Sequence, residues 1–285
     1  MRQSRYALLL VGIMLVWATT AVAGRIESVN ETVEMEGAER LVIECDFGAG
    51  ELYIVPEDIP EAARLKITYD KRHFDYSIDY DPSGDVGYLF LESDTRRASN
   101  IRSADNEWDV ILSTRHPTEL ELDIGACEAD LDLGGIPLTE VSMDIGAASG
   151  TIDFSARNPE RMDDLEVDIG ASSVELLNLG NANFDRMQFS SGAASCELDF
   201  RGEFRGESDV TLDIGLGSAK IILPEGLAVR IEIEGDNWFS SIDFHNDDLD
   251  EVDDDIFETP DFDRADDRIV ISVDVGMGSA DFYFR

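Results

Sequence analysis

Apolar and polar residues alternate along short stretches of this chain, and a glycine interrupts each stretch. In VSMDIGAASGTIDF, residues 141–154, apolar residues recur at every second position up to Gly146 and then resume in the opposite phase. Period-2 alternation predicts a β-strand with one buried face. A shift of one residue would turn that face outward, so we expect a bulge or corner at the glycine that restores the inward direction. Each stretch therefore predicts two short strands with a bend between them.

The same unit recurs seven times along the chain. Its glycines are Gly48, Gly125, Gly146, Gly170, Gly192, Gly215 and Gly276, and a weaker unit contains Gly235. From Gly125 to Gly215 the spacings are 21, 24, 22 and 23 residues, which is typical of solenoids and other stacked arrays. Mostly small residues stand two and four positions after each glycine, which indicates a narrow interior at the corner. We predict an all-β, single-stranded right-handed β-solenoid; a β-sandwich with regular strands is the alternative.

The remaining segments lack this period. Residues 56–112 predict an irregular antiparallel part, with a hairpin turn at residues 81–84. Its expected strands cover residues 65–69, 76–80, 87–93 and 108–112. Residues 243–267 contain 13 acidic residues among 25, which predicts a mobile loop between the last two repeats. The predicted organisation is a signal peptide at 1–23, an N-terminal β part with the first repeat at 24–112, and stacked repeats at 113–285.

The first residues are typical of a secretory signal peptide. Arg2 and Arg5 precede an apolar run, and Ala21-Val22-Ala23 forms a small-x-small cleavage site. An uncleaved anchor helix is the alternative, but the run is short for a complete span. We expect an exported protein of the periplasm, the cell envelope or the extracellular space, which does not span the membrane after cleavage.

Acidic residues dominate the composition. The chain has 62 Asp and Glu against 22 Lys and Arg, a formal net charge of -40, and 43% hydrophobic residues supply a core. Nucleic acid is excluded as a partner because a polyanion needs a basic surface. Cations, cationic partners or a saline environment fit this charge better.

The thiols and imidazoles do not form a recognisable catalytic pattern. Cys45, Cys127 and Cys196 fall in inward columns of the repeat, so each predicts a small buried residue rather than a disulfide or a nucleophile. His73 and the two other histidines have neither metal-ligand nor triad spacing. The sequence therefore predicts no enzyme, and a β-helical polysaccharide lyase is the enzymatic alternative.

An acidic residue recurs two positions before the glycine. The column reads Asp46, Asp123, Asp144, Asp168, Ser190, Asp213 and Asp274. Stacked at about 4.8 Å, these carboxylates would repel one another. Either Ca²⁺ offsets the repulsion, with Asp123, Asp144, Asp168 and Asp213 as candidate ligands, or each carboxylate caps a backbone N–H at the corner. Ser190 favours capping, since serine accepts the same bond but is a poor calcium ligand. Residues 243–267 lack the order of an EF-hand loop.

Six units share a core that resembles the toast-rack repeat, which occurs in bacterial adhesin-like proteins and in the C-terminal region of the cell-wall-active-antibiotic response protein LiaF. The matching pieces are CDFGAGEL, LDIGACEADL, MDIGAASGTI, VDIGASSVEL, LDIGLGSAKI and VDVGMGSADF. The resemblance covers about residues 38–285 and implies a β-solenoid-like domain of single-stranded coils. It also implies action through protein contacts, in some members in envelope-stress signalling. LiaF-type proteins place several membrane helices before the domain, whereas this chain has only the cleavable signal. No site residues carry over.

Together these observations predict a non-catalytic binding or scaffold module, whose partner is an envelope protein or a surface component. A Ca²⁺-dependent surface adhesin is the main alternative, and a β-helical carbohydrate-active enzyme is the other. An exposed aromatic row would favour sugar binding. Its candidate members are Tyr53, Tyr283, Trp238 and Phe239.

Overall fold

The computed structural model describes residues 26–96, 106–235, 240–245 and 249–285. The predicted signal peptide lies outside these ranges. Nearly all regular structure in the described part is β, and its only helical elements are the short 3-10 helices η2 (Leu179–Ala182) and η3 (Phe262–Arg264). No helix of this part is long and apolar enough to cross a membrane. The predicted all-β class is confirmed.

The strands follow one another along the chain with few long connections. In the N-terminal part they are β1 (Ile26–Val33), β2 (Arg40–Glu57), β3 (Ala63–Asp70), β4 (Phe74–Ser83), β5 (Val86–Thr95) and β6 (Asn106–Ser113). The central ones are β7 (Thr118–Asp132), β8 (Leu138–Ile145), β9 (Ser149–Asp153), β10 (Met162–Ile169), β11 (Ser173–Leu177), β12 (Phe184–Asp199) and β13 (Glu207–Leu223). The last are β14 (Ala228–Glu234), β15 (Ser241–His245), β16 (Asp250–Asp253), β17 (Ile256–Glu258) and β18 (Arg268–Phe284).

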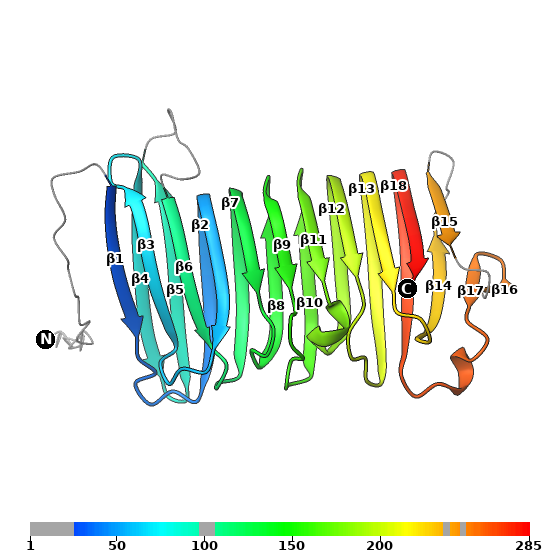
Figure 1. Cartoon of the computed structure of the whole chain (residues 1–285), viewed down its shortest axis with the longest axis horizontal. Coiled ribbons are helices and arrows are strands. Elements are labelled where there is room, and N and C mark those ends of the chain that lie inside the picture. Colours follow the sequence, from blue (N-terminus) through cyan, green and yellow to red (C-terminus); the bar gives the residue numbers. More distant parts are fainter. Residues whose placement is uncertain (1–25, 97–105, 236–239, 246–248) are drawn as a thin grey trace, which may run out of the picture.

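The repeat units stack in parallel and in register. Leu122 pairs with Met143, and Met143 pairs with Val167, as the apolar columns predict. The same column continues through Phe189, Leu212 and Val273. Each unit contributes to two layers of the stack, either as one long bent strand such as β7 or as two strands such as β8 and β9 (Figure 1). This parallel pairing is incompatible with the regular β-sandwich, and the right-handed sense of the winding stays a prediction.

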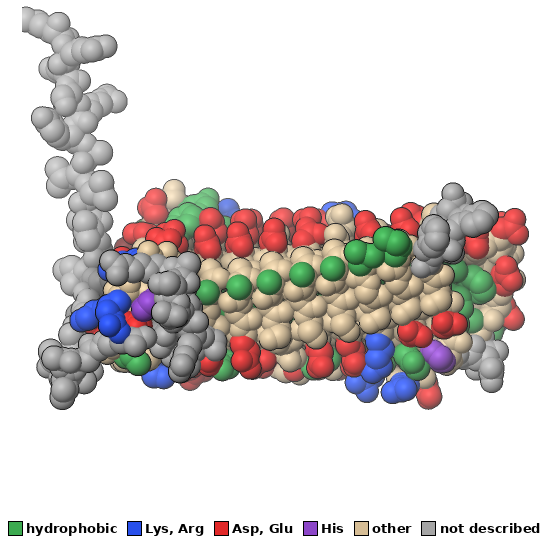
Figure 2. Space-filling model, turned by 90° about the horizontal axis from the view of Figure 1, so that it is seen from above, with side chains coloured by type: hydrophobic (Ala, Val, Ile, Leu, Met, Phe, Trp, Pro, Cys, Tyr) green, Lys and Arg blue, Asp and Glu red, His purple; other side chains and the backbone are tan. Residues whose placement is uncertain are grey.

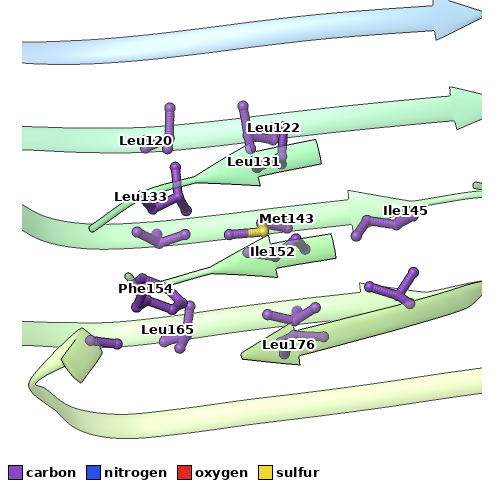
Figure 3. Packing of buried hydrophobic residues seen from close by; sticks show 14 of the residues in the cluster. Leu120, Leu122, Leu131, Leu133, Met143, Ile145, Ile152, Phe154, Leu165 and Leu176 are labelled. Atoms are coloured by element: carbon purple, nitrogen blue, oxygen red, sulfur yellow. The ribbon is translucent and has the colours of Figure 1, made fainter. Parts of the chain in front are cut away.

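The core is the narrow space between the two layers. Side chains of successive units, among them Leu122, Met143 and Ile152, point into this space from both sides (Figure 3), and each is at most 2% exposed. Small residues line the corner, because the layers converge there. Gly217 shows how close the units are: its φ is +133°, and an added Cβ would lie 1.9 Å from the carbonyl oxygen of Ala194 in the neighbouring unit.

The N-terminal part is antiparallel in β1–β3, β3–β6 and β4–β5, as predicted. The hairpin turn falls at Gly84 and Asp85, slightly later than expected, because Pro82 and Ser83 still belong to β4. Strands β5 and β6 also pair in parallel with the two halves of β2. They therefore form a further unit of the stack, which the lack of periodicity in residues 56–112 concealed.

The C-terminal end differs from the expected order. Strand β18 pairs in parallel with β13 on one side and with β14 and β15 on the other, so it lies between units that precede it in the chain (Figure 1). The acidic segment 243–267 does not separate the last two repeats in space. Nor is it simply a loop: it contains the end of β15, the hairpin of β16 and β17, and η3. The hairpin is held because β17 pairs with β14.

Candidate binding surface at the corners of the stack

Three columns of exposed side chains run along the edge where the units turn. The first, the acidic column, lies two positions before each corner. Its members pair in register: Glu92, Asp46, Asp123, Asp144, Asp168, Ser190, Asp213, Asp274 and Glu234. The pKa of the Asp46 carboxyl is raised, mainly by burial. The negative charges of Asp123, Glu92 and Asp94 raise it further, which shows that neighbouring members of the column repel one another.

The four predicted metal ligands thus lie in one row. Asp123, Asp144 and Asp168 occupy consecutive units, and Asp213 follows after the unit of Ser190. All four are exposed. Within the described residues no group of three or more His, Cys, Asp or Glu side chains is arranged to hold a metal ion. Binding of Ca²⁺ to this row stays a prediction.

The corner N–H groups have backbone acceptors. Gly146 and Ala147 donate to the carbonyl oxygens of Ile124 and Gly125 at 2.8 Å, and the next corner repeats this pattern at Gly170. These bonds link the corner to the preceding unit. Because these N–H groups already donate to carbonyl oxygens, they do not need a carboxylate as an acceptor. At these two corners the N–H groups therefore have backbone partners in place of the expected Asp side chains, and capping elsewhere in the column stays a prediction.

The second column is an apolar ridge on the corner itself. It consists of Ala49, Ala126, Ala147, Ala171, Ala193, Leu216 and Met277. All except the half-buried Ala49 are exposed, and Leu216 and Met277 are 47% and 57% exposed. Figure 2 shows this row along the middle of one face, with acidic side chains along both margins. A contiguous exposed apolar row of this kind is a candidate interaction surface.

The third column consists of serines that follow the corner of each unit, on the layer that contains β9, β11 and β15. Ser149, Ser173, Ser195, Ser218, Ser279 and Ser241 pair in this order. Sequence reasoning missed it, although a serine stands three positions after the glycine in most units. Because the side chains are short, the surface is hollowed here into a groove of about 260 Å³. Besides serines, its lining includes Glu175, Glu197, Lys220, Asp281 and Tyr283.

Charged side chains form one wall of the groove. Lys220 Nζ lies 2.9 Å from Glu197 Oε2. At the end of the wall, the Tyr283 ring stacks on His245 with 4.3 Å between ring centroids, and the Arg285 guanidinium lies 4.8 Å from the Tyr283 centroid. The ring is therefore already packed against side chains of this chain. Tyr53 lies in β2, far along the stack and in another column, so the two tyrosines form no aromatic row. Trp238 and Phe239 lie outside the described residues.

Nucleophilic chemistry would require an activated thiol, or a hydroxyl beside an imidazole. All three cysteines are buried and free, and burial raises the pKa of Cys45 and Cys127 to about 12 and of Cys196 to about 11. Such thiols are poor nucleophiles. His245 Nε2 lies 3.5 Å from Asp281 Oδ1, but the Ser279 hydroxyl donates to the same carboxylate rather than to the imidazole. A hydrolytic triad needs its serine at the imidazole.

The fold and surface define an all-β protein of parallel stacked units with regular columns of exposed side chains. The chain belongs to the toast-rack family: residues 22–164 match the N-terminal domain of toast_rack, DUF2154. The predicted family is confirmed. No curated protein matches the chain significantly.

Several crystal structures are similar to this chain. A candidate cell adhesion protein from Clostridium sporogenes is 18% identical, with a TM-score of 0.48, over 91% of this chain and 100% of that one. A candidate adhesin from Bacteroides fragilis is 9% identical, with a TM-score of 0.38, over 91% and 98%. A candidate lipid binding protein from Parabacteroides distasonis is 14% identical, with a TM-score of 0.34, over 91% and 97%.

Proposed function

We propose that the protein is a non-catalytic binding module of the periplasm or cell envelope, and that its groove holds an extended polar surface component. The groove over β11, β12, β13 and β18 carries this proposal. Its serine hydroxyls both donate and accept hydrogen bonds. They recur at about the strand spacing of 4.8 Å, and carboxylates beside them accept hydrogen bonds strongly. Such a surface suits a polymer with repeating hydroxyl groups, such as a cell-surface polysaccharide.

The non-catalytic assignment is supported by what surrounds the groove. The thiol of Cys196 lies below the groove surface and is buried. Lys220 is neutralised by Glu197, and the carboxylates of the wall are spread over several units. An active site instead clusters perturbed groups around one reacting atom.

Binding of the purified protein to cell-surface polysaccharide from the producing organism tests the proposal. Ser195→Arg fills the groove and should weaken binding at least tenfold. Ser142→Arg is the matched control, because it adds the same side chain in β8 of the other layer, between Glu121 and Glu166. Both variants should melt like the parent. Equal binding by both variants, or none by the parent, contradicts the proposed function.

A Ca²⁺-dependent surface adhesin is the second candidate, which the in-register acidic column favours. A ligand specific to the native state raises the melting temperature by mass action. Thermal unfolding in excess EDTA, in millimolar Ca²⁺ and in millimolar Mg²⁺ at matched ionic strength distinguishes binding from screening. A rise with Ca²⁺ that is lost in Asp144→Asn/Asp168→Asn supports this candidate. An equal, small response to both ions removes it.

A further inference from the structure

The apolar ridge is long and continuous. It crosses seven units, from Ala49 to Met277, and at about 4.8 Å per unit it extends for about 29 Å. Alanines make most of it low and flat, while Leu216 and Met277 project at one end. Figure 2 shows the row uninterrupted along the face. Another elongated element can therefore lie along this strip, as we also call the ridge, and contact two larger side chains at one end.

The charges beside this strip determine which kind of partner can bind there. The acidic column, with eight carboxylates among nine positions, follows one margin of the strip. The column of short serines borders the other margin, and the whole chain has a formal net charge of -40. The carboxylates of the acidic column repel a second copy of this chain and an anionic lipid surface, because both are negatively charged. The acidic margin attracts Lys and Arg placed along one side of an apolar stripe.

We infer that the apolar ridge and the acidic column dock a basic amphipathic helix of a partner protein. A helix of about 20 residues is about 30 Å long, which matches the ridge. Its apolar stripe would lie on the alanines, which allow close approach, and would pack against Leu216 and the adaptable side chain of Met277. Its Lys and Arg side chains would reach the carboxylates beside the strip. This surface borders the groove, since Ala193 and Ser195 lie two residues apart in β12, but the inference does not depend on what the groove binds.

A designed 20-residue helical peptide with a leucine stripe and lysines along one side of that stripe is the probe. Fluorescence anisotropy of the labelled peptide with the purified protein gives the Kd at low and at high salt. Leu216→Ser/Met277→Ser should weaken binding at least tenfold. Val55→Ser/Phe90→Ser is the matched control, because these side chains are 46% and 43% exposed elsewhere, and it should change the Kd less than twofold.

The acidic column is tested separately. Asp144→Asn/Asp168→Asn should weaken peptide binding about threefold to tenfold and reduce its salt dependence, since it removes two facing charges. Asp79→Asn/Asp81→Asn, with the same loss of charge in β4, should have little effect. Peptide binding is measured without polysaccharide and polysaccharide binding without peptide, so failure of the proposed function and failure of this inference are distinguishable.

Four outcomes overturn the inference. Equal losses in the ridge variant and its control, or equal binding of a scrambled peptide of the same composition, mean non-specific attraction. A dimer in sedimentation that Leu216→Ser/Met277→Ser abolishes assigns the ridge to a second copy of this chain. Binding to anionic vesicles that depends on the same two side chains assigns it to a membrane.

Discussion

Substitution of Gly217 by alanine tests how tightly the units are stacked. The added Cβ would lie 1.9 Å from the carbonyl oxygen of Ala194 and 2.9 Å from its carbonyl carbon. These atoms must separate by more than about 1 Å before they reach ordinary carbon–oxygen contact. The backbone of Gly217 has a φ of +133°, which alanine adopts only at a cost of about 1–3 kcal/mol.

The cost of the contact adds to the backbone term. Separating β12 from β13 beside the pairs Ala194–Gly217 and Ser195–Ser218 weakens about two backbone hydrogen bonds, each worth about 1 kcal/mol. We therefore expect Gly217→Ala to lower the free energy of unfolding by about 3–5 kcal/mol. Urea unfolding measures this difference, provided that the m-value is unchanged.

Gly206 supplies the matched control. Its φ is +75°, but nothing lies within 4 Å of a Cβ added there, so Gly206→Ala should cost only the backbone term of about 1–2 kcal/mol. The difference between the two variants reports on close contact between units. If Gly217→Ala costs no more than Gly206→Ala, the interior at the corner is not narrow and our explanation of the repeated small residues is refuted.

Two further predictions concern thiols and pH. The three cysteines should resist alkylation by iodoacetamide at pH 8 in the native protein and react fully in urea; rapid native modification would contradict their burial. The free energy of unfolding should rise as the pH falls from 7 to 5, because the pKa values of Asp46 and Glu140 are raised in the folded state, so that these two groups bind protons more tightly there than in the unfolded chain. The lowered pKa values of Asp58, Glu61 and Asp164 act in the opposite direction, mainly below this range. This gain is complete once the pH is below the unfolded values of 3.8 and 4.5; a urea midpoint that falls steadily from pH 7 to 5 would contradict it.

The periodic part of the fold was predictable because burial there is decided within each unit. Leu122, Met143 and Val167 occupy one inward column simply because each stands three positions before a glycine corner. The unit of β5 and β6 was not predictable in this way. The segment between these strands has no glycine unit to mark the corner, and only the pairing with β2 shows their place in the stack.

The surface was less predictable than the core. The acidic column could be seen in the sequence, but the backbone acceptors of the corner N–H groups could not, since they belong to the preceding unit. The groove depends on which columns meet on one layer. Ser195 and Ser218 lie 3.4 Å apart between hydroxyl oxygens, although 23 residues separate them in the chain.

The order of units at the two ends has a common physical explanation. All units share one pattern, so the pattern alone allows any unit to stack on any other. Strand β18 forms 16 residue pairs with β13, whereas it forms 12 with β14 and β15 together. With β18 inside, the shorter and more polar unit of β14 and β15 lies at the open end, and the fully exposed strand β16 lies beyond it.

The N-terminal end follows the same rule. After β1 the chain forms the regular strand β2 and then doubles back, so that the antiparallel strands β3 and β4 lie outside the unit of β5 and β6. Stacked arrays need polar end units, because an open strand edge would otherwise pair with another chain. Irregular strands thus lie at both ends of the stack, while the most regular units remain inside. Each departure from chain order therefore places a less regular strand, rather than a repeat unit, at an end of the stack.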